Sequence, residues 1–201
     1  MLTPTSRPTR QRLVDAAEKL MRTTGLASAT TKAIAREAGC SEAALYKHFA
    51  SKEELFVRVI HERLPNIAPL IGELIADPGE RGVEECLAEL VRQAARFYEE
   101  AFPMFGTLLA EPALRAQYQD GLRKIDAGPH LAVEGVARYL ERERERGRIR
   151  VDADPYAAAA LLMGACFQRA FFIQVSGPDR VPPAEEFAAA VARTAWAAVR
   201  P

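Results

Sequence analysis

The sequence is poor in the residues that build disulfides and metal centres. Its 201 residues include three cysteines, at positions 40, 86 and 166, and three dispersed histidines. An odd number of widely separated cysteines makes no full disulfide set, and the N-terminus does not resemble a signal peptide. We therefore expect a protein of the reducing cytoplasm. Because no histidine or cysteine pair has metal-ligand spacing, we also expect no metal and no cofactor.

Catalytic motifs and long apolar runs are missing as well. The chain contains no glycine-rich phosphate loop, no G-x-S-x-G and no H-E-x-x-H. We therefore expect no enzyme and assign no catalytic residue. The longest apolar stretch, Tyr156 to Phe167, is too short to span a bilayer, so we expect no membrane partner.

Strand patterns are absent too, because apolar and polar residues alternate nowhere over a sustained stretch. Apolar residues instead recur every three or four positions between breaks at glycine and proline. This pattern predicts an all-α fold with about nine helices, or ten if each expected segment is counted separately, preceded by a disordered arm over 1–6. The expected helices cover about 7–24, 31–38, 42–49, a long one from 51 with a kink or break near Pro65 and Pro69, 82–101, 103–111, 112–127, 129–146, 155–175 and 183–199.

Charge is unevenly distributed along a chain whose formal net charge is zero. Residues 1–52 hold nine Lys and Arg against four Asp and Glu, which gives +5 there and −5 in the remainder. A basic head on an acidic body suits a polyanion that binds at one end only. The run Glu141 to Arg150 mixes both signs, and we interpret it as a solvated helix end rather than a second DNA site.

The most informative segment is TTKAIAREAGCSEAALYKHFASKEEL, from Thr30 to Leu55. Gly39 stands where a first short helix must stop, because glycine takes a positive φ without steric cost. Ser41 is a good N-cap for a second short helix. Leu45 and Phe49 then give that helix an apolar inner face. Two short helices joined by a tight turn form a helix-turn-helix, whose second helix enters the major groove of DNA.

The same letters resemble the DNA-binding signature of the TetR family of bacterial transcriptional regulators. The matching features are the Thr pair that opens the first helix, Ile34-Ala35, Ala38-Gly39, Ser41, the block Tyr46-Lys47-His48-Phe49, and Ser51-Lys52-Glu53. The signature covers about a quarter of the chain. Cys40 and the pair Glu42-Ala43 depart from the usual family pattern, which affects base preference rather than fold.

The resemblance implies a set of DNA-contacting residues on the two short helices and the start of the next one. We expect Thr31, Tyr46, His48 and Lys52 to hold phosphates. Lys47 is the best candidate for reading a base, since lysine can donate to guanine O6 and N7. Glu42 could accept from cytosine N4 or merely favour the helix N-terminus. The full expected set is Thr31, Lys32, Ser41, Glu42, Ala43, Ala44, Tyr46, Lys47, His48 and Lys52.

The resemblance also implies two domains. We expect a helix-turn-helix DNA-binding domain over 7–67 and a helical effector-binding and dimerisation domain over 68–201. In the family the last two long helices of each subunit form a four-helix dimer interface, a role that falls here on 155–175 and 183–199. An intramolecular core is the alternative, because periodicity alone does not separate the two.

An effector pocket is the last feature that the resemblance implies. Aromatic and methionine side chains suit an adaptable apolar cavity, although plain core packing is the alternative for each one. Tyr98, Gln117, Tyr118 and His130 are candidate polar anchors. The expected lining consists of Phe97, Tyr98, Phe102, Met104, Phe105, Leu109, Tyr118, Met163, Phe167 and Phe171.

Together these features predict a ligand-responsive repressor. The expected partners are a palindromic double-stranded DNA operator, a second copy of the chain and a small apolar or aromatic effector. Three alternatives stay open at this point: a DNA-binding regulator without an effector, an activator, and a protein–protein adaptor on the same fold.

Overall fold

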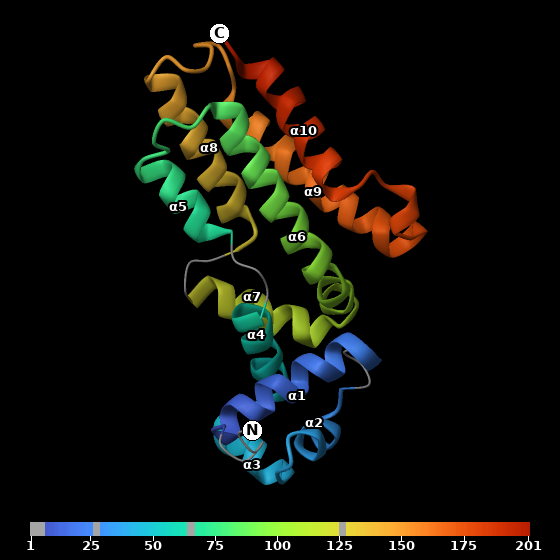
Figure 1. Ribbon diagram of the computed structural model, residues 1–201. Helices are drawn as coiled ribbons and strands as arrows, with labels where there is room; N and C mark the ends of the chain where they lie inside the picture. Colours follow the sequence, from blue (N-terminus) through green and yellow to red (C-terminus); the bar gives the residue numbers. More distant parts are fainter. Residues whose placement is uncertain (1–6, 26–28, 64–66, 125–127) are drawn as a thin grey trace. The chain divides into compact units, whose positions relative to one another are not determined.

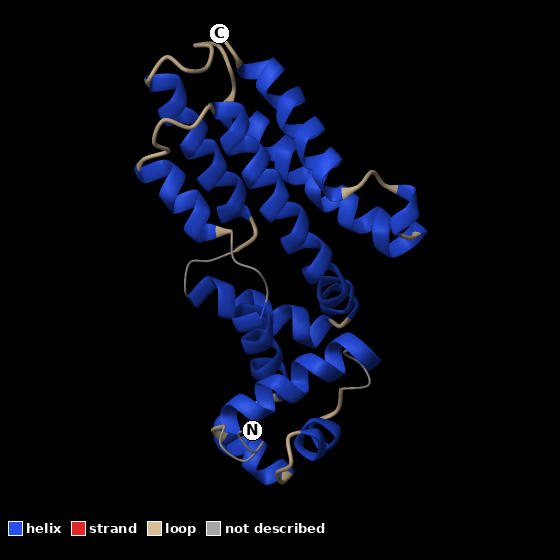
Figure 2. Cartoon of the chain, in the orientation of Figure 1, coloured by secondary structure: helices blue, strands red, loops and turns tan. Residues whose placement is uncertain are grey.

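The computed structural model describes residues 7–25, 29–63, 67–124 and 128–201, so the arm expected over 1–6 lies outside the described residues. Within these ranges the chain forms ten α helices, one 3₁₀ helix and no strand (Figures 1 and 2), which confirms the all-α prediction. The helices are α1 (Thr9–Thr24), α2 (Thr31–Glu37), α3 (Glu42–His48), α4 (Lys52–Arg63), α5 (Ala68–Ala76), α6 (Val83–Ala110), α7 (Pro112–Lys124), α8 (His130–Glu145), α9 (Pro155–Ser176), η2 (Pro178–Arg180) and α10 (Ala184–Val199).

The chain divides into two compact units. One comprises Met1–Leu64 with Pro103–Asp126, and the other comprises Pro65–Phe102 with Ala127–Pro201. The first unit therefore includes the end of α6 and all of α7, a stretch that the sequence assigned to the C-terminal domain. The expected boundary between a DNA-binding domain over 7–67 and an effector-binding domain over 68–201 stays a prediction.

The first unit is built around the apolar faces of α1 and α4. Leu13 and Val14 of α1 and Leu55 and Val59 of α4 are fully buried, and Leu114 of α7 joins the same cluster. These residues recur at helical spacing, so each helix turns one apolar stripe inward. The short helices α2 and α3 complete the cluster by contributing Ile34 and Leu45. Helices α1 to α4 thus share one core with Leu114, which comes from a distant part of the chain.

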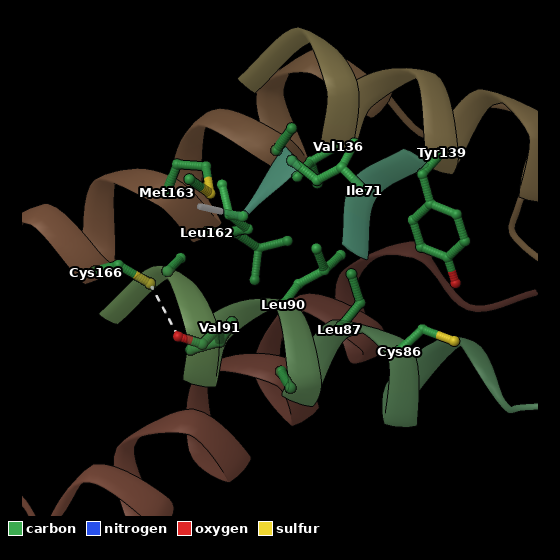
Figure 3. Packing of buried hydrophobic residues seen from close by; sticks show 14 of the residues in the cluster. Ile71, Cys86, Leu87, Leu90, Val91, Val136, Tyr139, Leu162, Met163 and Cys166 are labelled. Carbon is green, nitrogen blue, oxygen red and sulfur yellow. Dashed lines mark hydrogen bonds between the residues drawn. The ribbon is translucent and has the colours of Figure 1, made fainter. Parts of the chain in front are cut away.

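The second unit has a larger core, contributed by α5, α6, α8, α9 and α10. Figure 3 shows Leu87, Leu90 and Val91 of α6 facing residues of α5, α8 and α9. The approach of α5 to α8 is close at Gly135, because a Cβ placed there would lie 2.6 Å from Cγ2 of Ile71. Glycine at this position lets the two helices pack at a distance that no other residue permits without a shift.

Two sequence expectations need correction, and the first concerns Pro103. A new helix was expected to begin there, but α6 continues through it from Val83 to Ala110. Proline removes one helical hydrogen bond. Ala101 and Leu108 are buried on either side of it, and we attribute the continuity of the helix to their packing. The break near Pro69 is confirmed, since α4 ends at Arg63 and α5 starts at Ala68, whereas Pro65 lies outside the described residues.

The second correction concerns the charged run after Leu140. Glu143 is fully buried rather than solvated, while Glu141 is exposed as expected. Gly147, with φ of 71°, turns the chain so that the amide of Arg148 donates to the carbonyl of Glu143 at 2.9 Å. This turn brings the Arg148 side chain back to the Glu143 carboxylate.

Helix α9 is longer than the apolar stretch considered from the sequence. Its 22 residues, Pro155 to Ser176, are long and apolar enough to cross a membrane by length and composition, whereas the stretch considered from the sequence was Tyr156 to Phe167 alone. In the second unit, however, Leu162, Met163 and Cys166 of this helix belong to the core (Figure 3). Part of the apolar surface of α9 is therefore buried against other helices of the second unit.

Candidate nucleic-acid interface

The helix-turn-helix forms as the sequence indicated, because each short helix is capped by a side chain. The hydroxyl of Thr30 accepts from the amide of Ala33, and that of Ser41 accepts from the amide of Ala44, both at 3.2 Å. Such caps satisfy backbone donors that have no partner within the helix. Between the helices Gly39 has φ of 66°, a left-handed conformation that confirms the predicted turn.

The second short helix, α3, has a buried face and an exposed face. Leu45 of α3 and Phe49, the residue directly after the helix, are buried in the core of the first unit. Tyr46 is 53% exposed, so its ring is a surface feature rather than a core residue. Of the predicted contacts, Thr31, Ala44 and Lys52 are half-buried; the exposed ones are Lys32, Ser41, Glu42, Ala43, Tyr46, Lys47 and His48.

Several cations on this surface are available to a new partner. Within the described part of the chain, the side chains of Lys32, Arg36 and Lys47 are exposed and make no ion pair or hydrogen bond. Other cations of the head are already paired, as Lys19 is with Glu37 at 2.5 Å. Unmatched, exposed cations are suited to phosphate groups. Arg36 was not among the predicted contacts, although it lies on the exposed side of α2.

The start of α4 is held by a reciprocal cap. The amide of Glu54 donates to the Ser51 hydroxyl at 3.1 Å, and the amide of Ala50 donates to the Glu54 carboxylate at 2.6 Å. This arrangement resembles a capping box, which fixes the first turn of a helix, but the carboxylate accepts from the residue before the N-cap Ser51. Lys52 lies in that turn, with its Nζ 5.0 Å from the centroid of the Phe56 ring. The capped turn therefore gives Lys52 a defined position at a helix N-terminus.

Thr31 and Glu42 make a contact that the sequence did not predict. The Thr31 hydroxyl donates to Oε1 of the Glu42 carboxylate at 2.5 Å, and so joins the first turns of α2 and α3. Both residues were expected to contact DNA independently. Only the tertiary arrangement of α2 beside α3 could have identified them as a pair.

The predicted effector residues fall into two groups. In the second unit, the Tyr98 ring packs edge-on against Phe167 with centroids 5.7 Å apart. Phe102 lies 5.4 Å from Phe167 and 6.0 Å from Phe171. Phe97 and the buried Met163 belong to the same unit. The five predicted aromatic residues of this unit form one cluster on α6 and α9, and their role as an effector site stays a prediction.

The remaining four predicted residues belong to the first unit. Phe105 and Tyr118 pack against its core, and Leu109 is 62% exposed. The side chain of Met104 lies outside the described residues. The ten residues therefore do not form a single cluster within either unit.

A buried charged residue of the second unit was missed. Arg169 of α9 is 7% exposed and lies 2.7 Å from the carboxylate of Glu99, while it also donates to the carbonyl of Pro182 at 2.6 Å. Burial raises the pKa of the nearby Cys166 thiol to about 12 and raises the pKa of Tyr98. An arginine inside a long and largely apolar helix was the sequence signal that could have identified this site.

An open hollow of about 400 Å³ lies elsewhere in the second unit. It is bordered by the first turn of α6 and by α10, and none of the ten predicted effector residues lines it. Its walls are Gly82, Glu84, Glu85, Ala88, Ala189, Ala192 and Arg193. Among the described residues, no group of three His, Cys, Asp or Glu side chains could hold a metal ion.

Two family models match the chain. Residues 13–59 match the bacterial regulatory proteins of the tetR family, and residues 106–198 match the C-terminal domain of AefR-like transcriptional repressors. Together these two matches cover more than half of the sequence. The first match contains both short helices and the start of α4.

Relatives and solved structures agree with the family models. The chain is 28% identical over 147 residues to YvkB, an uncharacterised helix-turn-helix transcriptional regulator of Bacillus subtilis, with 71% of each chain covered. It is 24% identical over 145 residues to the repressor AcnR of Corynebacterium efficiens, covering 71% of this chain and 70% of AcnR. SmeT, the repressor of a Stenotrophomonas maltophilia multidrug efflux pump, has the same fold, with a TM-score of 0.70, 22% identity and coverage of 99% and 93%. The chain thus belongs to the TetR family of bacterial transcriptional regulators, which bind DNA through their helix-turn-helix.

Proposed function

We propose that the protein is a homodimeric repressor that binds a palindromic operator and leaves it when a small apolar or aromatic ligand binds. The exposed outer face of α3, with unmatched cations beside it, is the observation that carries this proposal. Two relatives, AcnR of Corynebacterium efficiens and BdcR of Escherichia coli, are named as repressors, which supports repression over activation. The proposed site of action is the cytoplasm, where bacterial DNA lies.

On DNA, α3 would enter the major groove with Leu45 and Phe49 turned away from it. Lys47, exposed and without a partner in the described chain, would donate to a guanine edge. Tyr46, His48 and Lys52 would hold phosphates, which fix the register of the protein on the duplex. Ala43 and Ala44 are small enough to allow a close approach to the base edges.

Dimerisation would use the exposed side of α9. Leu161 is 76% exposed and Val175 is 66% exposed, which is unusual for large apolar residues on one helix. They belong to a stripe with a spacing of three or four residues, made of Ala157, Leu161, Gly164, Gln168, Phe172 and Val175. Such a stripe, with the small residues of α10, suits a four-helix interface between two copies. A dimer would present two copies of α3 to half-sites about 34–36 Å apart.

Gly164 allows a direct test of this interface. A Cβ at Gly164 would meet no atom within 4 Å in the chain, and the same holds for Gly72 on α5. Gly164→Leu should therefore leave the fold intact but block a partner helix, whereas Gly72→Leu should leave the oligomeric state unchanged. Sedimentation velocity measures both variants. A Gly164→Leu protein that stays dimeric would remove α9 from the interface.

The effector would bind at the aromatic cluster of α6 and α9. Tyr98, Phe102, Phe167 and Phe171 offer aromatic surface, and Arg169 with Glu99 supplies polar groups on the same two helices. SmeT, whose fold this chain shares, forms a complex with triclosan. We propose an effector of similar character, small and largely apolar, without naming a compound.

Release from the operator needs only a modest difference in ligand affinity. A ligand that favours a second conformation draws the population away from the DNA-bound form. Tenfold weaker operator binding corresponds to about 1.4 kcal/mol of coupling free energy. The effect is reciprocal, so operator DNA should weaken effector binding by the same factor.

The experiment that tests the proposal is genomic footprinting with the purified full chain, followed by operator titration with and without a metabolite library. We expect protection of a palindrome and release by at least one apolar compound. Protection that no compound relieves would leave a regulator without an effector. Failure to protect any genomic site would contradict the proposed function as a whole.

A further inference from the structure

Glu42 stands out on the proposed DNA-facing surface because it is an acid among cations. It is exposed in the first turn of α3. The exposed Lys, Arg, Asp and Glu side chains nearest to it in the motif are Arg36, Glu37, Lys47 and Lys32, and Glu37, the other acid, is already paired with Lys19. A carboxylate in this position is repelled by phosphates. It is compatible with tight binding if the DNA offers it a hydrogen-bond donor in return.

The structure gives this carboxylate a defined orientation. Oε1 accepts from the Thr31 hydroxyl at 2.5 Å, and Oε2 has no hydrogen-bond partner among the described residues. A side chain that is already fixed loses less conformational entropy on binding. The Thr31 hydroxyl has a single proton, and a phosphate only accepts, so Thr31 does not donate to a phosphate while it holds Glu42.

The major groove presents very few donors to a carboxylate. The base edges there carry acceptors on guanine and thymine, and donors only at cytosine N4 and adenine N6. Adenine places the N7 acceptor beside N6, which repels a carboxylate. On the cytosine ring itself, the neighbour of the amino group in the groove is C5–H rather than an acceptor, and so cytosine is the best match for the free oxygen of Glu42.

We propose that Glu42, held by Thr31, reads the amino group of one cytosine in each half-site. Glu42 is then a specificity residue of the recognition helix and Thr31 is a positioning residue rather than a phosphate contact. This inference rests on the proposed binding of DNA by α3. It differs from a helix-end role for Glu42, which would stabilise α3 and leave base preference unchanged.

The test is selection of operators from a library with randomised half-sites, performed with the full-length dimer and its variants. Wild type should show one cytosine position that Glu42→Gln relaxes by about fivefold to a hundredfold, since one base contact carries discrimination of this order. Affinity for non-specific DNA should rise a few-fold in the same variant, because one repulsive charge is removed. Glu53→Gln, the same charge change in α4, should raise non-specific affinity without altering the base profile.

Two further variants separate positioning from folding. Thr31→Val removes the hydroxyl at nearly constant volume and should weaken the preference at that same cytosine, whereas Thr31→Ser should retain it. If Glu42→Gln keeps the wild-type base profile while Lys47→Ala changes its own position, the inference about Glu42 is wrong and DNA binding by α3 stands. If wild type selects no sequence at all, the proposed function fails instead.

Discussion

Glu143 and Arg148 form an ion pair in which the carboxylate is fully buried, with Oε2 of Glu143 2.6 Å from Nε of Arg148. Arg148 also donates to the carbonyl of Arg81 at 3.2 Å, which joins the end of α8 to the loop before α6. Arg146 adds a second cation at 3.2 Å. Through its contacts with Glu143 and with the Arg81 carbonyl, Arg148 therefore joins two segments of the second unit that are far apart in sequence.

Removing Arg148 should destabilise the second unit strongly, because it leaves a buried carboxylate without its main partner. We expect Arg148→Ala to lower the free energy of unfolding by about 3 kcal/mol, at the lower end of the range for broken buried pairs since Arg148 is partly exposed. Urea unfolding measures the change. Glu141→Ala, an exposed acid on the same helix, should change stability by less than about 0.5 kcal/mol. Equal effects would show that the pair does not contribute.

Tyr139 should make stability decline at alkaline pH. Its pKa is raised above the ordinary value of 10.0, first by burial and then by the neighbouring Cys86 thiol (Figure 3). Below pH 10 both the folded and unfolded states keep the proton, so the contribution is complete. Above pH 10 the unfolded state loses its proton first, and stability falls by up to about 1.4 kcal/mol per pH unit for this group.

Tyr139→Phe isolates this contribution from those of the other tyrosines. Tyr98 and Tyr118 also have raised pKa values, so wild type loses stability above pH 10 for several reasons. The variant should show a shallower decline between pH 10 and 11 in urea unfolding, with little difference at pH 7. Parallel curves for the two proteins would contradict the burial of the Tyr139 proton.

Lys52 and Lys47 should have different effects on DNA binding. Lys52→Ala should weaken binding to all sequences alike and flatten the slope of log K against log[salt] by about one unit, as expected for one lost phosphate contact. Lys47→Ala should instead relax preference at one base pair per half-site. Fluorescence anisotropy across a salt series distinguishes them. Arg96→Ala, an exposed cation of the second unit, is the control and should change neither quantity.

Gly135 should not accept a side chain. The added Cβ of Gly135→Ala would lie 2.6 Å from Cγ2 of Ile71, a branched group with little freedom to move. We expect a net loss of about 1–2 kcal/mol, because overpacking outweighs the gain of about 1 kcal/mol in helix propensity. Gly72→Ala, which meets no atom within 4 Å, should show only the gain. Thermal unfolding of both variants measures the difference, and a stabilised Gly135→Ala would contradict the close packing.

The structure of the helix-turn-helix, α2 and α3, could be predicted closely because the residues that determine it are local. The positive φ at Gly39 and the capping hydroxyl of Ser41 follow from single residues and their immediate neighbours. The exposed and buried sides of α3 follow from helical spacing. The family resemblance added the identity of the residues on the exposed side, which periodicity alone does not supply.

Features that depend on long-range packing were predicted less well. Pro103 has the same local signal whether it begins a helix or lies within one, and α6 continues through it with buried residues on both sides. Phe105 and Tyr118 look like the other aromatic residues in sequence, yet they pack in the core of the first unit. The side chain of Glu143 was expected to face solvent, because a turn two residues after the helix cannot be read from charge pattern.

The sequence by itself determined an all-helical chain and a capped helix-turn-helix, since these depend on contacts between residues a few positions apart. It also determined the basic N-terminal segment, which is a matter of composition alone. The tertiary structure decided the partners of Thr31, Glu143 and Arg169, each of which lies against a residue from another element or across a turn. Such contacts depend on how whole helices pack against one another. That placement reflects the burial of many apolar side chains at once and not the chemistry of any one position.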